Sequence, residues 1–403
     1  MRILQVNKFF YVRGGSERYF FDLCHLLKAR GHEVLHFSMR HPRNEPSEQA
    51  DFFVSEIDFN SDMSLGQKLG AALRILYSSE AKRRIADLLD RFKPDIVHFH
   101  NINRQLSPSI IDAVSARSIP MVQTLHDLSL VCPAHSFFVN GKPCEDCGRG
   151  AYWHGIFKRC IDGKLTSSLL GVAEAYLHAW LRIYRKIARF IAPSRFLGSK
   201  VAKLGWTENR IIHLPYFVPE APDCSDSNDG YVLFAGRVSR EKGVGLLVDA
   251  ACELTDLDFI VAGEGEALPD YERTVESRGI SNVRFVGYVK GDDLENLLKG
   301  AACVVVPSVS YENLPLSILE AFARGKPVVG ARSGGIPELV KDGETGFTFE
   351  SSDAKGLARA IRSTLADEDL RRRMGKQARS LIAGEFSADY HYSRIMQIYE
   401  DLV

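Results

Sequence analysis

Two series of short apolar, β-branched runs, each alternating with helix-like segments, dominate this sequence. The first series comprises residues 3–6, 34–37, 96–99, 121–125 and 190–192, and the second comprises residues 231–236, 259–263, 283–287, 303–307 and 328–330. Strands that are apolar along their whole length and alternate with helices are typical of parallel sheets covered on both faces. The sequence therefore predicts two doubly wound α/β domains, in which ligands bind near the carboxyl ends of the strands.

The segment between the two series reads as a linker. Residues 215–230 are rich in Pro, Ser, Asp and Asn and have no helical periodicity, as in the segments that join domains. We expect a first domain over residues 1–214, this linker, a second domain over residues 231–384 and a C-terminal helix over residues 385–403. A chain of 403 residues is long enough for two such domains.

The formal net charge of zero hides an asymmetry between the two halves. Residues 1–210 carry 30 Lys and Arg against 20 Asp and Glu, and residues 211–403 carry 21 against 31. A protein without an overall basic charge is not expected to coat nucleic acid. Polar residues occur among the first eight residues before any long apolar region, so a secretory signal is not expected. The stretch 165–181 is too short to span a bilayer. We therefore expect a cytoplasmic protein, at most peripheral at the inner face of a membrane.

Glycine-rich turns follow several of the predicted strands. Gly14 and Gly15 precede an apolar helix, where they either expose N–H groups to an anion or simply form a turn. Arg237 and Lys242, five residues apart in a loop that enters a helix, either hold a diphosphate or are solvated. A third turn, at residues 263–268, lacks the last glycine of a dinucleotide fingerprint. Nicotinamide binding is therefore not expected.

The most specific pattern surrounds a proline that suits the first turn of a helix. Pro315 would place Glu312 in the preceding loop and Glu320 on the helix. The free N–H groups near Asn313 and Leu314 would then have a carboxylate on either side. Such a site suits a ligand with hydroxyl groups at both ends and phosphates between them. The alternative is that one carboxylate caps the helix and the other is solvated.

Several of these motifs together resemble the retaining glycosyltransferases of family 4. They are Gly14-Gly15-x-Glu17, His126-Asp127, Gly236-Arg237 with Glu241-Lys242-Gly243, and Glu312-x7-Glu320. The resemblance covers nearly the whole chain. It implies the GT-B fold, in which two Rossmann-like domains face a cleft and the C-terminal helices cross back to the first domain.

The resemblance also implies roles in the second domain. Arg237 and Lys242 would neutralise the nucleotide diphosphate, and Glu320 would hold the ribose hydroxyls. Glu312 and the backbone at residues 313–314 would hold the donor sugar. In this family the acceptor is thought to attack from the same face as the leaving group, so a carboxylate nucleophile is not expected.

In the first domain, the resemblance places His126 beside the donor sugar, which makes it and Glu312 the two expected catalytic residues. Gly14 and Gly15 would lie near the phosphates and the acceptor, with Glu17 in the same loop. The expected reaction is retaining transfer of a hexose-type sugar from a UDP- or GDP-type donor to the hydroxyl of a saccharide or lipid-linked acceptor. It would serve bacterial lipopolysaccharide, other surface polysaccharide or glycolipid synthesis.

No cofactor is expected in catalysis, because the Asp-x-Asp patterns at residues 256–258 and 367–369 do not follow strands and read as surface charges. Two other readings stay open. One is an epimerase or phosphorylase on the same fold, and the other is a non-catalytic, zinc-dependent binding protein.

An insertion over residues 128–165 holds four of the eight cysteines, Cys132, Cys144, Cys147 and Cys160. Their spacing, C-x11-C-x2-C-x12-C, contains one Cys-x-x-Cys knuckle and two outlying partners, which could close a tetrahedral structural zinc site. An iron–sulfur cluster and reduced structural thiols are the alternatives.

Residues 158–210 are rich in Lys and Arg, with Leu177, Trp180, Leu181 and Tyr184 interleaved. This pattern predicts either an amphipathic basic surface that contacts anionic lipid or a helix that covers its own domain.

Overall fold

The computed structural model describes residues 1–57, 64–206, 208–219 and 229–403. The chain forms two compact units. The first contains Met1–Asn140, Cys144–Leu214 and Tyr392–Val403, and the second contains Gly141–Pro143 and Pro215–His391. Most of the expected linker, residues 220–228, lies outside the described residues.

The first unit is built on a parallel sheet with the strand order β2-β1-β3-β4-β7-β8. Its strands are β1 (Arg2–Val6), β2 (Glu33–Phe37), β3 (Ile96–Phe99), β4 (Met121–Thr124), β7 (Arg189–Ala192) and β8 (Ile211–His213). β3 and β4 are buried along their whole length, as expected for strands with helices on both faces. The strand order reverses direction at β1 and β3, so the carboxyl ends of these two strands mark the switch point where ligands bind in such sheets.

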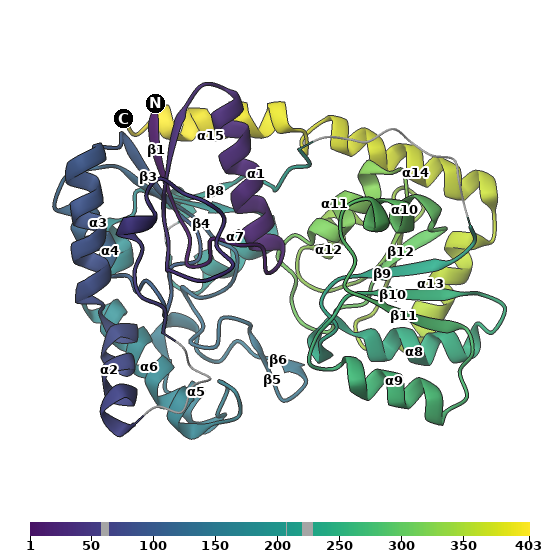
Figure 1. Cartoon of the computed structure of the whole chain (residues 1–403). Coiled ribbons are helices and arrows are strands. Elements are labelled where there is room, and N and C mark those ends of the chain that lie inside the picture. Colours follow the sequence, from purple (N-terminus) through teal and green to yellow (C-terminus); the bar gives the residue numbers. More distant parts are fainter. Residues whose placement is uncertain (58–63, 207, 220–228) are drawn as a thin grey trace. The chain divides into compact units, whose positions relative to one another are not determined.

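The helices of this unit lie between its strands along the chain (Figure 1). They are α1 (Gly15–Ala29), α2 (Leu65–Leu76), α3 (Ser79–Phe92), α4 (Ser109–Ser115), α5 (His154–Phe157), α6 (Leu165–Trp180) and α7 (Arg195–Lys203). The insertion between β4 and α6 also contains the two-residue strands β5 (Phe138–Val139) and β6 (Lys142–Pro143).

The second unit repeats this architecture, with the strand order β11-β10-β9-β12-β13-β14. Its strands are β9 (Val232–Ala235), β10 (Phe259–Ala262), β11 (Val283–Gly287), β12 (Cys303–Val306), β13 (Val328–Ala331) and β14 (Gly346–Phe349). Its helices are α8 (Val244–Glu253), α9 (Leu268–Ser277), α10 (Asp292–Gly300), α11 (Leu316–Ala323), α12 (Ile336–Leu339), α13 (Ala354–Leu365) and α14 (Glu368–Ala383). Here the switch point lies at β9 and β12, which pair in parallel.

The last helix, α15 (Ala388–Glu400), begins in the second unit and ends in the first. Tyr392 bonds to His32 through its hydroxyl oxygen, at 2.8 Å from the His32 Nε2. Tyr399 is fully buried and contacts the polar interior of the first sheet. The helix therefore completes the first unit, as the family resemblance implies.

The α/β architecture predicted from the apolar runs is confirmed, but the runs missed two edge strands. β8 has three half-buried residues, and β14 begins at Gly346 and is buried only at its two ends. Edge strands lack a partner on one side and do not need the continuous apolar pattern on which the prediction depends.

Candidate functional site

The switch point of the second sheet brings two of the predicted donor-binding residues into contact. The loop after β9 ends in a short turn at Arg240–Lys242, and the loop after β12 carries Glu312. The Lys242 Nζ lies 2.7 Å from the Glu312 Oε1. The sequence placed these residues in separate motifs 70 positions apart, and the parallel pairing of β9 and β12 brings the two loops together.

Charge at Glu312 is balanced by neighbours on both loops. Its side chain is only 12% exposed, and burial by itself would raise the pKa of this carboxyl. Lys242, a hydrogen bond donated by the Ser308 hydroxyl and the more distant Arg237 together hold that pKa below its usual range. Glu312 is therefore ionised at neutral pH, beside two cations.

Close backbone packing fixes the geometry of these loops. Gly243 has a φ of +74°, and a Cβ at this position would lie 2.0 Å from the Pro307 carbonyl oxygen. A Cβ on Gly334, which has a φ of +63°, would lie equally close to the Glu312 carbonyl oxygen, which accepts a hydrogen bond from the Gly335 N–H at 2.8 Å. Only glycine fits at these two positions, because any other side chain would collide with the neighbouring backbone.

Four further residues of the second unit were predicted to bind the donor, whereas Gly15, predicted with them, begins α1 of the first unit. Arg237 has a side chain that is 62% exposed, and its Nη2 lies 3.0 Å from the Glu241 Oε1. Asn313 is half-buried and Leu314 is buried, both in the loop before α11. Glu320 lies on α11, half-buried. Each of these four residues lies in the loop or helix in which it was expected.

One detail of the helix start differs from expectation. Pro315 lies just before α11, with a ψ of 118°, rather than within its first turn. An extended ψ keeps the proline outside the helix, which begins at Leu316. The missing N–H of the proline is still harmless there.

In the first unit, His126 belongs to a stack of three histidine rings. The ring centroids of His100 and His126 are 5.2 Å apart with an interplanar angle of 23°, and those of His98 and His100 are 4.4 Å apart at 27°. His98 bonds to the Tyr399 hydroxyl at 2.7 Å and to the Thr124 hydroxyl at 2.8 Å. His98 and His100 are buried, whereas His126 is half-buried at the end of β4.

The partners of these rings fix the proton on His126. The Gln5 Oε1 can only accept, so the His100 Nε2 donates to it across 2.8 Å. In a neutral ring the His100 Nδ1 is then an acceptor, and the His126 Nε2, 2.9 Å away, donates to it. Burial, together with Lys8 and against the opposing effect of Asp127, lowers the pKa of His126 to about 4. His126 is thus a neutral imidazole whose Nδ1 has acceptor character.

The glycine turn after β1 does not have the backbone that the sequence suggested. Gly14 has an extended φ of −171° and precedes α1, whose first residue is Gly15. A Cβ on Gly14 would meet only the Glu17 carboxylate, at an ordinary 3.9 Å. Glu17 is buried and accepts a hydrogen bond from the Ser16 hydroxyl at 3.1 Å. The fold itself therefore does not require a glycine at position 14.

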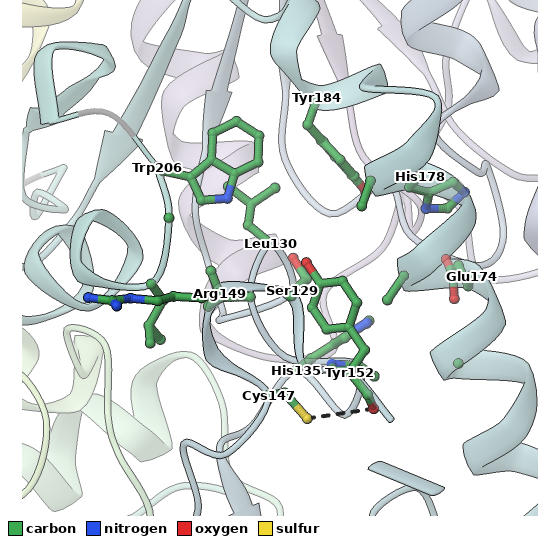
Figure 2. Close-up of a pocket in the computed structure, with 18 of the residues that line it drawn as sticks. Ser129, Leu130, His135, Cys147, Arg149, Tyr152, Glu174, His178, Tyr184 and Trp206 are labelled. Carbon is green, nitrogen blue, oxygen red and sulfur yellow. Dashed lines mark hydrogen bonds between the residues drawn. The ribbon is translucent and has the colours of Figure 1, made fainter. Parts of the chain in front are cut away.

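A pocket of about 300 Å³ opens in the first unit beside the loop that follows His126 (Figure 2). Glu174 and His178 reach it from α6, and Tyr184 from the segment after α6. Its rim includes Arg149 and Arg182, two exposed residues with left-handed backbone at φ values of 56° and 52°. Residues other than glycine with a left-handed backbone conformation are more frequent at functional sites than elsewhere.

Glu174 is the most unusual group in this pocket. It is 7% exposed, and burial raises its pKa to about 7, against the lowering effects of Arg104 and Lys8. Lys8 follows β1, and burial lowers its pKa although Asp127 and Glu17 raise it. Lys8 is not among the residues that line the pocket and acts on Glu174 only through its charge. A carboxyl group with a strongly shifted pKa in a pocket is typical of binding and catalytic sites.

The pocket was not predicted from the sequence. Tyr184, which was expected either on a basic surface or in a segment that covers its own domain, lines the pocket and donates to the Asn103 Oδ1 at 2.7 Å. Glu174 could have been noticed, because it interrupts an otherwise uncharged stretch from Leu165 to Leu181. A carboxylate at a position that the helix buries indicates a polar partner or a ligand.

Neither of the two Asp-x-Asp patterns lies at the carboxyl end of a strand, since the first directly precedes β10 and the second begins α14. Asp256 forms an exposed ion pair with Arg362, and Asp367 accepts hydrogen bonds from the first N–H groups of α14. Among the described residues, no helix is both long and apolar enough to cross a membrane.

Two family models match the chain in succession. The model described as Glycosyltransferase Family 4 matches residues 13–221, which is over half of the chain, and that of Glycosyl transferases group 1 matches residues 223–381. The chain belongs to Glycosyltransferase Family 4. The family predicted from the motifs is thereby confirmed, and the fold is GT-B.

Two curated relatives match part of the chain at about one third identity. An alpha-D-kanosaminyltransferase of Streptomyces kanamyceticus is 33% identical over 42% of this chain and 45% of its own length. The lipopolysaccharide core biosynthesis glycosyltransferase LpsE of Rhizobium meliloti is 32% identical over 54% of this chain and 58% of its own length. The chain thus spans about half the length of these two relatives.

A solved structure matches the whole fold. The crystal structure of Anabaena Alr3699/HepE in complex with UDP-glucose superposes with a TM-score of 0.71 and 18% identity, over 100% of both chains. At this sequence identity, the match shows that the two proteins share a fold and shows nothing further.

Proposed function

We propose that this protein is a retaining glycosyltransferase that moves a hexose-type sugar from a UDP- or GDP-sugar to the hydroxyl of a saccharide or lipid-linked acceptor, without a metal cofactor in catalysis. The observation that carries the proposal is the Lys242–Glu312 pair, 2.7 Å apart at the switch point of the second sheet. Its supporting context is the family, whose relatives include LpsE, and a structural neighbour crystallised with UDP-glucose. Synthesis of lipopolysaccharide or another surface polysaccharide is the process we propose.

In this proposal the second unit binds the donor. Arg237 and Lys242 face the diphosphate, where a leaving nucleoside diphosphate gains negative charge that fixed cations stabilise. Glu312 accepts hydrogen bonds from the donor sugar, and Glu320 from the ribose. Because residues 211–403 carry more acidic than basic side chains, donor affinity rests on these few cations rather than on the field of the whole unit.

The first unit supplies the acceptor side. His126, neutral at physiological pH, can accept a hydrogen bond from a sugar hydroxyl through its Nδ1. The pocket beside it has the volume of a small ligand, with Glu174 as an acceptor for hydroxyl groups and two arginines at its rim for an anionic group. Gly14, which the fold does not require to be glycine, leaves room for a ligand near the switch point of this sheet.

We also propose peripheral contact with anionic lipid. α5 and α6, which contact each other, expose the aromatic side chains of Phe157 and Trp180, each almost four-fifths exposed. Arg159 and Lys164 are exposed on the segment between them. Apolar side chains beside basic ones favour an interfacial position at an anionic membrane.

Donor binding is tested with a panel of UDP- and GDP-sugars in a thermal-shift assay. A sugar nucleotide at 100 times its Kd adds about 2.7 kcal/mol to stability. Arg237→Ala should weaken donor binding at least tenfold, whereas Arg278→Ala, an exposed arginine paired with Asp249 in the same unit, should leave it unchanged. If no nucleotide sugar shifts the midpoint, or if Arg237→Ala binds like the wild type, the donor proposal fails.

Product analysis then separates the possible activities. A retaining transferase releases nucleoside diphosphate only with an acceptor and forms a product with the anomeric configuration of the donor, which NMR reports. An epimerase changes the sugar nucleotide without an acceptor, and a phosphorylase requires inorganic phosphate.

Membrane contact is tested by sedimentation with phosphatidylglycerol and phosphatidylcholine vesicles. Phe157→Ser with Trp180→Ser should abolish binding to the anionic vesicles. Tyr288→Ser, which removes an aromatic side chain that is 63% exposed in the second unit, should not. Equal sedimentation of all three proteins would overturn the proposal.

A further inference from the structure

The four cysteines of the insertion line one small cavity in the first unit. Cys132 lies on the loop after β4, Cys144 and Cys147 follow β6, and Cys160 follows α5. The space at the centre of the cavity, about 20 Å³, holds about one water-sized sphere. Three separate segments of the chain thus place four cysteines in the lining of one space of about the size of an ion.

Backbone N–H groups are directed at two of these sulfur atoms. Those of Ala134, His135 and Phe137 hydrogen-bond to the Cys132 Sγ, and that of Gly155 to the Cys147 Sγ. The Lys158 Nζ lies 3.3 Å from the Cys144 Sγ. Burial nevertheless raises the pKa of Cys132 to about 11 and that of Cys147 to about 12, so without a metal these thiols are protonated at neutral pH. The N–H donors are placed to stabilise the thiolates that a bound metal would create.

The surrounding segment has little else to fix its shape. Between Cys132 and Cys160 the regular elements are β5 and β6, with two residues each, a 3-10 helix at Gly148–Gly150, and α5, with four residues. Gly155 packs so closely that a Cβ on it would lie 3.2 Å from the Cys160 Sγ. A short, loop-rich segment with a Cys-x-x-Cys knuckle and two further thiols is the usual setting of a structural zinc ion.

We propose that Cys132, Cys144, Cys147 and Cys160 bind one Zn²⁺ in a tetrahedral, purely structural site. Binding forms four Zn–S bonds and releases the four thiol protons to solvent. The resulting site carries two negative charges, and the ammonium group of Lys158 lies beside it.

Binding requires the cysteine side chains to move. Among the described residues, no three or more His, Cys, Asp or Glu side chains have the arrangement of a metal site. The Cys147 thiol instead donates to the Tyr152 carbonyl at 3.8 Å (Figure 2). Rotation of this and the neighbouring thiols toward the centre of the cavity brings the sulfur atoms together, since all four already line it.

The zinc would also shape the neighbouring pocket. Cys147 lines both the cysteine cavity and the pocket that contains Glu174, and Tyr152 and Pro133 extend from the insertion into the wall of that pocket. The ion would hold this wall in place without touching substrate. The inference is independent of the proposed transferase activity, because it concerns the fold of residues 132–160.

The test begins with the wild-type chain, purified under reducing conditions without an affinity metal. Elemental analysis should find one zinc per chain. Exchange for Co²⁺ should give the intense thiolate-to-cobalt charge-transfer absorption and the visible bands of a tetrahedral site. Absence of zinc, with no uptake of added ZnSO₄ by calorimetry, overturns the proposal. So does a mass lower by the hydrogens of a disulfide among these four cysteines.

Variants then assign the ligands. Cys147→Ser should reduce the zinc content severalfold. Cys252→Ser, which changes a half-buried cysteine on α8 of the second unit, should keep a full equivalent. Cys160→His supplies another zinc ligand and should retain the metal where Cys160→Ser loses it. Full zinc in Cys147→Ser, or the same zinc content in both Cys160 variants, would overturn this ligand set.

Discussion

Removing Lys242 should destabilise the protein by leaving Glu312 buried without its main cation. Breaking a fully buried ion pair costs about 3–5 kcal/mol. Here the two side chains are 30% and 12% exposed, and the Ser308 hydroxyl still donates to the carboxylate, so we expect Lys242→Met to lose about 2 kcal/mol. For a unit of this size, that loss lowers the unfolding midpoint by about 4–8 °C.

The dependence on pH gives a second measure of the same interaction. The pKa of Glu312 is lowered in the folded protein, so its pairing stabilises above the unfolded value of about 4.3 and is lost as the pH falls through the folded value. In Lys242→Met, burial should instead raise the pKa of Glu312. The stability difference between wild type and variant should therefore be largest near pH 7 and shrink toward pH 4.

A double-mutant cycle monitored by urea unfolding measures the coupling. Glu312→Gln in the Lys242→Met background should recover at least 1 kcal/mol, because it removes the unpaired charge. The exposed Arg240–Asp270 pair is the control, with a coupling expected below about 1 kcal/mol. If the Lys242 and Glu312 losses simply add, or if the loss is the same at pH 4 and pH 7, the electrostatic reasoning is refuted.

Three further substitutions have defined outcomes. Tyr399→Phe removes a buried hydroxyl that bonds to a histidine at 2.7 Å and should cost about 1–3 kcal/mol in urea unfolding; a loss no larger than that of the half-buried Tyr392→Phe would contradict this. Glu174→Gln should gain stability relative to wild type as the pH rises from 5 to 8, because a folded pKa of about 7 lies above the unfolded value and ionisation then opposes folding; a constant difference would show that Glu174 titrates normally. Gly243→Ala should lower the free energy of unfolding by over about 2 kcal/mol, since its Cβ would lie 2.0 Å from a backbone oxygen. Gly279→Ala, at a φ of +62° with open space around it, should lower it by only about 1 kcal/mol. Equal losses of stability in the two variants would rule out the clash.

The site of the second unit was largely predictable because its residues lie in short motifs, each of which can be recognised within a few consecutive positions. Short motifs directly after apolar strands contain Arg237, Lys242 and Glu312, and the rule that ligands gather at the carboxyl ends of parallel strands was enough to group them. What the sequence could not give was the contact between Lys242 and Glu312, since it depends on the pairing of strands that are far apart in the chain. Nor could it show that Gly243 is required by the approach of the β12 loop.

The first unit was less predictable because its polar contacts are distant in sequence. His126 was singled out, but its hydrogen bond to His100 crosses 26 positions, and the bond of His98 to Tyr399 crosses 301. Rules based on periodicity or motif spacing do not predict contacts between residues so far apart in the sequence. The pocket with Glu174 depends on how α6 packs over the insertion, which propensity does not determine.

The route of α15 has a consequence for synthesis on the ribosome. Tyr399, near the very end of the chain, bonds to His98 and to Gln5, the latter 394 positions earlier. Until α15 has been synthesised, the sheet of the first unit therefore lacks the contacts that Tyr399 makes with His98 and Gln5. Since nascent domains normally fold in order of emergence, the sheet of the first unit, although it is made before that of the second, would reach its final form only after α15 has emerged. A truncation before Tyr399 would remove contacts made by residues that lie about 300 to 400 positions earlier in the chain.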